Sequence, residues 1–156
     1  MNDEMKIIRE VSYQAEVCYN DAVKLGEHAV HAIKANHRSQ LTNLENIAES
    51  TFKTSDVFDY IKRQTARQAD WRKPYSEQKD ADSNLPFGER LRNYLEQGLK
   101  LRLKTIYDHL KIDDVTDADK QERRRIHLLL IRQIIRHMVV NYEYNVSLGN
   151  SKRREQ

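Results

Sequence analysis

The chain has 156 residues, of which 33% are charged and 38% are hydrophobic, and its formal net charge is +3. Four Gly and two Pro are too few for the turns of a β-sandwich or β-barrel, and no apolar run is long enough for a transmembrane helix. The acidic start does not fit a signal peptide, and the lone Cys18 cannot form an internal disulfide. We therefore expect a cytoplasmic, all-α protein that does not enter a membrane.

The first half of the chain predicts three helices. Apolar and small residues recur at steps of three and four from residue 5 to residue 37, as in one long helix. Most of them are small, which would let a partner helix approach closely, and Gly26 could mark a bend. A second helix is expected near Thr42, which has capping-box spacing with Glu45, and a third would be capped at residues 55–56.

The second half of the chain contains a polar segment followed by two strongly apolar patterns. Residues 73–85 are polar, include Pro74 and have no periodicity, which predicts a mobile loop. A fourth helix is expected to begin at Pro86. The last helix, with Thr116 or Asp117 as its N-cap, is apolar over a wide arc, which places it at the centre of a bundle or against another subunit.

These elements predict a helical bundle of about five helices, with long first and last helices. Residues 1–149 would form this single domain, and Gly149 would end the last helix. Residues 150–156 would form a basic, flexible tail. The small-residue first helix and the apolar last helix offer more apolar surface than one thin bundle requires, which favours association with protein subunits or with a second copy.

Charge is divided unevenly along the chain. Residues 1–60 carry 6 basic and 10 acidic residues, whereas residues 61–156 carry 21 and 14. Because a polyanion responds to local clusters of charge, the basic blocks could contact phosphates, with Trp71 or Tyr75 stacking on a base. They could equally be solvated faces, and Trp71 could be a core residue. The expected phosphate contacts are Lys62, Arg63, Arg67, Arg72, Arg123, Arg124 and Arg125.

No motif for a cofactor or a metal is found in the sequence. It contains no phosphate-binding Gly-rich loop and no His-Glu-x-x-His zinc motif. Glu27 and His31 have a spacing that could share a metal, but no second pair on another helix completes a site. Cys18 falls on the packing stripe, as a core residue does. We therefore expect no metal and no cofactor.

Arg132 and His137, separated by four residues on the last helix, are the one candidate catalytic pair. This Arg-x4-His spacing resembles the motif of HEPN ribonucleases. The resemblance implies a metal-independent endoribonuclease. In such a site His137 would move a proton and Arg132 would stabilise the charge that develops at the phosphate. The alternative is that both residues simply flank the apolar core stripe of their helix.

Residues 130–144 form an apolar run that leads into a Tyr-x-Tyr stretch. This run resembles the terminal helix of the small subunits of type III CRISPR effector complexes, and the basic segment at 60–73 is similar more loosely. The resemblance implies a non-catalytic protein whose copies stack along an effector backbone and present basic side chains to RNA. The polar insertion at 73–84 and the acidic first helix depart from that pattern.

Residues and resemblance together favour a non-catalytic, RNA-binding helical subunit of a ribonucleoprotein or antiviral defence assembly. Its expected partners are RNA or another nucleic acid, protein subunits of the complex and a second copy of the chain. The two alternatives are a HEPN-like endoribonuclease and a helical protein–protein interaction module.

Overall fold

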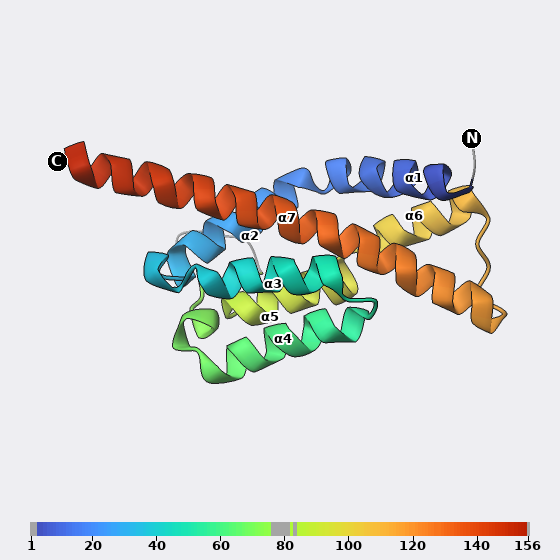
Figure 1. Ribbon diagram of the computed structural model, residues 1–156, viewed down its shortest axis with the longest axis horizontal. Helices are drawn as coiled ribbons and strands as arrows, with labels where there is room; N and C mark the ends of the chain where they lie inside the picture. Colours follow the sequence, from blue (N-terminus) through green and yellow to red (C-terminus); the bar gives the residue numbers. More distant parts are fainter. Residues whose placement is uncertain (1–2, 76–81, 83, 156) are drawn as a thin grey trace.

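The computed structural model describes residues 3–75, 82 and 84–155, and these contain helices and no strand (Figure 1). This confirms the predicted all-α fold. Three short turns, η1 (Ala35–His37), η2 (Ala69–Arg72) and the π-helical η3 (Tyr94–Gly98), lie between or beside the longer helices. The α-helices are α1 (Asp3–Val17), α2 (Tyr19–Ala32), α3 (Ser39–Ser50), α4 (Thr54–Arg67), α5 (Phe87–Asn93), α6 (Lys100–Leu110) and α7 (Asp117–Glu155).

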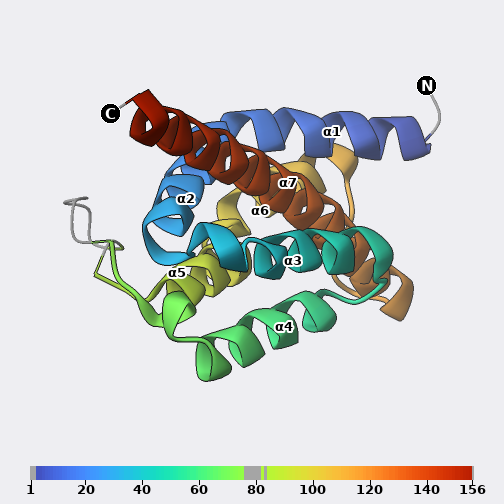
Figure 2. The same cartoon turned by 60° about the vertical axis from the view of Figure 1, so that its left-hand side comes forward.

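The predicted long first helix is in fact two helices, because the chain turns at Cys18. Cys18 has φ −88° and ψ 2°, outside the helical range, and α1 and α2 leave it in different directions (Figure 2). Gly26 does not mark the bend. A Cβ at Gly26 would lie 3.0 Å from the carbonyl oxygen of Met138, so this glycine allows α2 to approach α7 closely. The small-residue stripe therefore packs as predicted, although its helix is broken.

The starts of α3 and α4 differ from the predicted caps. α3 begins at Ser39, and the Thr42 hydroxyl donates to the carbonyl oxygen of Arg38 at 3.1 Å within the first turn. The capping box predicted at Thr42 is therefore wrong. α4 begins at Thr54, and its N-cap residue Lys53 offers no side-chain acceptor to the helix amides. The residues predicted to cap α4, at 55–56, lie inside its first turn.

The predicted fourth helix is the succession α5, η3 and α6, which begins directly after Pro86. α7 has the predicted Thr116 cap: the Asp119 amide donates to Thr116 Oγ1 at 3.0 Å, and the Thr116 amide donates to Asp119 Oδ2 at 3.1 Å. α7 continues through Gly149 to Glu155, so the predicted stop is wrong and the predicted tail is helical over 150–155. The mobile loop predicted at 73–85 falls largely on residues 76–81 and 83, which lie outside the described residues, as does residue 156.

α7 is the central helix, as its wide apolar arc predicted. It packs against α1, α2, α3, α4 and α6, and in Figure 2 it lies diagonally across the neighbouring helices. Fully buried side chains on α7 include Ile126, Leu130, Ile134, Met138 and Tyr142. Within the described part of the chain, no helix is both long and apolar enough to cross a bilayer.

α1 lies beside α7 and runs in the same direction (Figure 1). Glu4 forms an ion pair with Arg125 at one end of this seam. Further along, the Gln133 side-chain amide donates to Ser12 Oγ at 3.3 Å. The partners are 121 residues apart in the sequence in both contacts, so α1 and α7 stay in register along the line where they meet. The seam fixes the start of α1 beside the first half of α7, where the candidate site lies.

Candidate nucleic-acid interface

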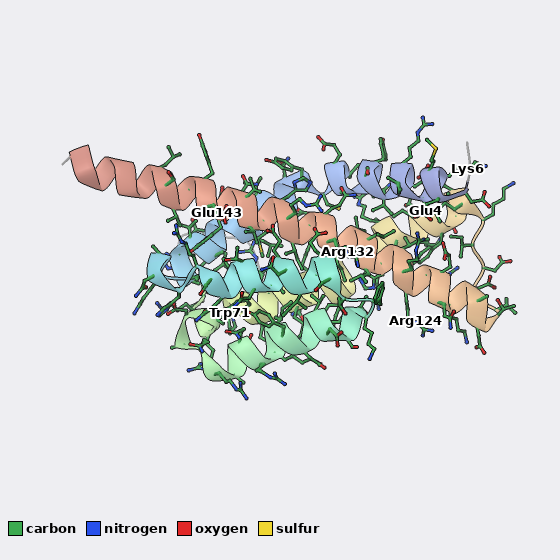
Figure 3. All side chains as sticks on the ribbon, viewed as in Figure 1. Glu4, Lys6, Trp71, Arg124, Arg132 and Glu143 are labelled. Atoms are coloured by element: carbon green, nitrogen blue, oxygen red, sulfur yellow. The ribbon has the colours of Figure 1, made fainter. Side chains whose placement is uncertain are left out.

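A groove of about 730 Å³ lies over the first half of α7. Its floor includes Leu128 and Leu129 of α7, one wall is Glu4 at the start of α1, and the other wall is the connection from α3 to α4, with Phe52 and Lys53. In Figure 3 the labelled Glu4 lies at α1, whereas Arg124 and Arg132 project from α7. The α7 residues that line the groove recur at steps of three and four, so one side of the helix supplies them all.

Phe52 stands at the rim of the groove with 96% of its surface exposed. The short connection that carries it is fixed by Thr51, whose Oγ1 accepts the Lys53 amide at 3.0 Å and donates to Asp56 Oδ2 at 2.5 Å. This turn leaves the Phe52 ring outside the core. A ring this exposed contributes little to the stability of the fold, and its face is available to a partner.

Arg132 brings a fixed positive charge to the groove. Its Nε donates to the carbonyl oxygen of Ala48 at 2.6 Å, and its Nη2 donates to that of Thr51 at 2.7 Å. These carbonyls end α3, where a cation interacts favourably with the helix dipole. No described residue accepts a hydrogen bond from Nη1, so one edge of the guanidinium stays available. The side chain is therefore held in place before any ligand arrives.

Three further cations complete the lining. Lys53 and Arg124 are exposed and form no ion pair with any described residue. Arg125 is already paired with Glu4 and with Glu122, the latter at 3.2 Å. Of the described residues that line the groove, four are basic and one, Glu4, is acidic, while Glu122 pairs with Arg125 from outside the lining. This excess of positive charge over an apolar floor creates a local field that attracts an anion.

Trp71 does not belong to this surface. Its exposed fraction is 0%, and its indole N–H donates to Gln40 Oε1 at 2.8 Å inside the fold. The prediction that Trp71 stacks on a base is therefore wrong, and the core alternative is correct. Tyr75 is half-buried and stacks on His28, with ring centroids 5.6 Å apart. Neither aromatic lies at the groove, and Trp71 is far from Arg124 in Figure 3.

Two of the predicted phosphate contacts hold backbone groups instead. Arg72 Nη1 donates to the carbonyl oxygens of Thr65 and Ala66 at the end of α4. Arg123 donates to the carbonyl oxygens of Asp113 and Ile112, and its guanidinium lies 4.4 Å from the centre of the Tyr107 ring. Arg123 is therefore on the opposite side of α7 from the groove. Successive helical residues are turned by about 100°, so the run at 123–125 cannot act as one patch.

The basic residues of α4 form a separate surface. Lys62, Arg63 and Arg67 are exposed and form no ion pair with any residue that the structure describes. α4 leaves the groove at Thr54 and places Arg67 about 20 Å further along at 1.5 Å per residue. The structure therefore does not bring the basic side chains of α4 together with Arg124 and Arg125.

The structure does not join Arg132 and His137 in one site. Arg132 contacts the end of α3, whereas the His137 ring packs edge-on against Tyr19, with centroids 5.2 Å apart. Burial, and secondly the neighbouring charge of Arg136, lowers the pKa of His137. The two side chains thus face different neighbours of α7 and do not converge on a common phosphate in this chain.

Phe52 and Lys53 were missed by sequence reasoning. Phe52 falls on no apolar stripe and stands in a short polar connection next to a lysine, and this was the signal that could have marked it. In the part of the chain that is described, no group of three or more His, Cys, Asp or Glu side chains is placed to hold a metal ion.

Comparison with protein-family models and with curated proteins finds no match for the chain, and comparison with solved structures finds none either. Function is therefore inferred from the chain's own geometry.

Proposed function

We propose that the chain binds nucleic acid, RNA in the first instance, in the groove over α7, as a non-catalytic subunit of a larger ribonucleoprotein or defence assembly. One observation carries the proposal: the most exposed phenyl ring of the described residues stands beside four basic side chains in a single groove. Lys53, Arg124, Arg125 and Arg132 would contact phosphates, and Phe52 would contact a base. The resemblance of residues 130–144 to type III CRISPR small subunits supports the assembly part of the proposal.

The test is a titration of labelled single-stranded RNA with the purified chain at two salt concentrations, followed by a denaturing gel. Binding that weakens as salt rises, with the RNA intact, is the expected result because phosphate contacts release counterions. Shortened RNA that persists in a His137→Ala variant, with contamination excluded, would remove the HEPN-like alternative. Shortened RNA that disappears in that variant would favour it. No binding at low salt would overturn the proposal and leave the basic side chains as solvated faces.

A protein-interaction role is a second candidate function, and one specific observation favours it. Val140, Tyr144 and Leu148 are all exposed and recur every fourth residue along the second half of α7. Such a stripe suits a helical partner, either another subunit or a second copy. Sedimentation at micromolar concentration tests the second copy, since a monomer at that concentration would count against self-association.

A further inference from the structure

We infer that the groove takes a single-stranded nucleic acid, with an unpaired base stacked on Phe52 and the adjoining phosphate held by Arg132. The inference rests on the proposed function and adds the class of nucleic acid that the site accepts. Three features of the groove carry it: the exposure of the ring, the fixed guanidinium and the volume.

The exposure of Phe52 selects for an unpaired base. With 96% of its surface in water, the ring offers a π-face that no side chain of the fold covers. In a duplex the base faces are already stacked on one another, and they reach a protein aromatic only when a base is splayed out. In a single strand every base has a free face, and stacking on an aromatic side chain is the usual source of affinity.

Arg132 adds a phosphate contact at a fixed position. Two of its donors are bound to carbonyl groups. The carbonyl of Ala48 lies at the end of α3, and that of Thr51 begins the connection that carries Phe52. The guanidinium is therefore fixed relative to the backbone that carries Phe52. Because little side-chain freedom remains to be lost, the phosphate contact forms at low entropic cost.

The volume and the walls of the groove fit one or two nucleotides. About 730 Å³ is within the range of sites that enclose a small ligand, roughly 300–1,000 Å³. Leu128 and Leu129 supply apolar lining in the same groove, and Lys53 and Arg124 supply basic lining. A duplex would reach only the basic lining, through its backbone. A single strand can use the basic lining, the apolar lining and the ring together.

The experiment compares two RNA probes: a 5′-fluorescein-labelled single strand of about 12 nucleotides, and the same strand annealed to its complement. Fluorescence anisotropy measures the affinity of wild-type protein, Phe52→Ala and Phe52→Trp for each probe. We expect the wild type to prefer the single strand, and Phe52→Ala to weaken that complex by about 5- to 100-fold, in line with the loss of one stacked base. Phe52→Ala should leave duplex affinity unchanged, and Phe52→Trp should retain single-strand binding with quenching of the new indole. Because Phe52 makes no core contact, its variants test binding rather than folding.

A charge-reversal variant, Lys53→Glu with Arg124→Glu, separates this inference from the proposed function. If the charge reversal weakens binding of both the single strand and the duplex, while Phe52→Ala changes neither affinity, the groove binds nucleic acid but the single-strand inference fails. If the charge reversal changes nothing, both fail. Tighter binding of an acidic peptide of similar charge than of the single strand would also overturn both, because the groove would then be a protein-docking site.

Discussion

Arg132 donates a hydrogen bond from Nε to the carbonyl oxygen of Ala48 at 2.6 Å, and so ties the central helix α7 to the last turn of α3. The same guanidinium reaches the carbonyl oxygen of Thr51, which begins the connection that carries Phe52. One side chain therefore supports the fold and lines the candidate groove. The residue that the sequence offered as half of a catalytic pair has a structural function of its own.

Replacing Arg132 with Ala should lower the free energy of unfolding by about 1–3 kcal/mol, because two carbonyl groups at the end of α3 lose their donor. Urea unfolding measures the change. Arg124→Ala is the matched control, since Arg124 is exposed and bonded to no described residue, and it should change stability by no more than about 0.5 kcal/mol. Equal stability of the two variants would show that Arg132 does not hold α3.

Removing the charge of Glu4 should strengthen RNA binding. Among the described residues that line the groove, Glu4 is the one acid, and it shares Arg125 with Glu122. In Glu4→Gln the Arg125 guanidinium keeps only Glu122 as a partner and the groove loses a negative charge, so the slope of log affinity against log salt should steepen, by at most about 0.7 for a single strand. Glu10→Gln makes the same change in charge on α1, where Glu10 faces His109 rather than the groove. If both variants shift RNA affinity equally, the effect comes from net charge and not from the groove.

Gly88→Ala should destabilise the packing of α5 on α4. A Cβ at Gly88 would lie 1.8 Å from Thr65 Oγ1, and that hydroxyl already donates to the carbonyl oxygen of Ile61. Relief of this clash requires Thr65 to give up that hydrogen bond or α5 to shift away from α4, which costs about 1–3 kcal/mol of stability. At Gly149 a Cβ would meet nothing within 4 Å, so Gly149→Ala should be neutral or slightly stabilising. Thermal unfolding of the two variants distinguishes these outcomes.

Asp70 should make stability depend on acid pH. Burial acts to raise the pKa of this carboxyl, but hydrogen bonds from His37 and the Lys34 amide, together with the charge of Lys73, outweigh burial and hold the pKa below its ordinary value of 3.8. The ionised form therefore stabilises the fold above about pH 4, and this contribution fades as pH falls through the folded-state pKa. Asp70→Asn should be less stable at pH 7 and lose less stability between pH 4 and pH 2. Parallel stability curves for the two proteins would contradict this assignment.

Some local patterns predicted local structure, whereas the capping box at Thr42 and the helix stop at Gly149 did not. The wide apolar arc of α7 and the Thr116 cap depend on residues within a few turns of one another, and both are as predicted. The break at Cys18 has no such signal, because the apolar stripe passes through it without interruption. It follows from how α1 and α2 each pack on other helices, which is a property of the tertiary structure.

The site was harder to predict because exposure is decided by distant parts of the chain. Trp71 and Phe52 are both aromatic residues close to basic ones, yet Trp71 is enclosed by the fold and Phe52 is not. Arg123 and Arg124 are adjacent in sequence, but helical rotation aims one at Tyr107 and leaves the other at the groove. Composition indicated a basic surface, and only the packing of α1, α3 and α4 around α7 decides which basic side chains share it.

The most direct measurement is the RNA affinity of two double charge-reversal variants that change the formal net charge equally. Lys53→Glu with Arg124→Glu alters the groove, and Lys62→Glu with Arg67→Glu alters the exposed face of α4. If the groove is the binding site, the first variant loses about tenfold or more in affinity at low salt, and its salt dependence becomes shallower. The second variant should bind nearly as the wild type does. Equal losses in the two variants, or a larger loss in the α4 variant, would contradict a binding site in the groove.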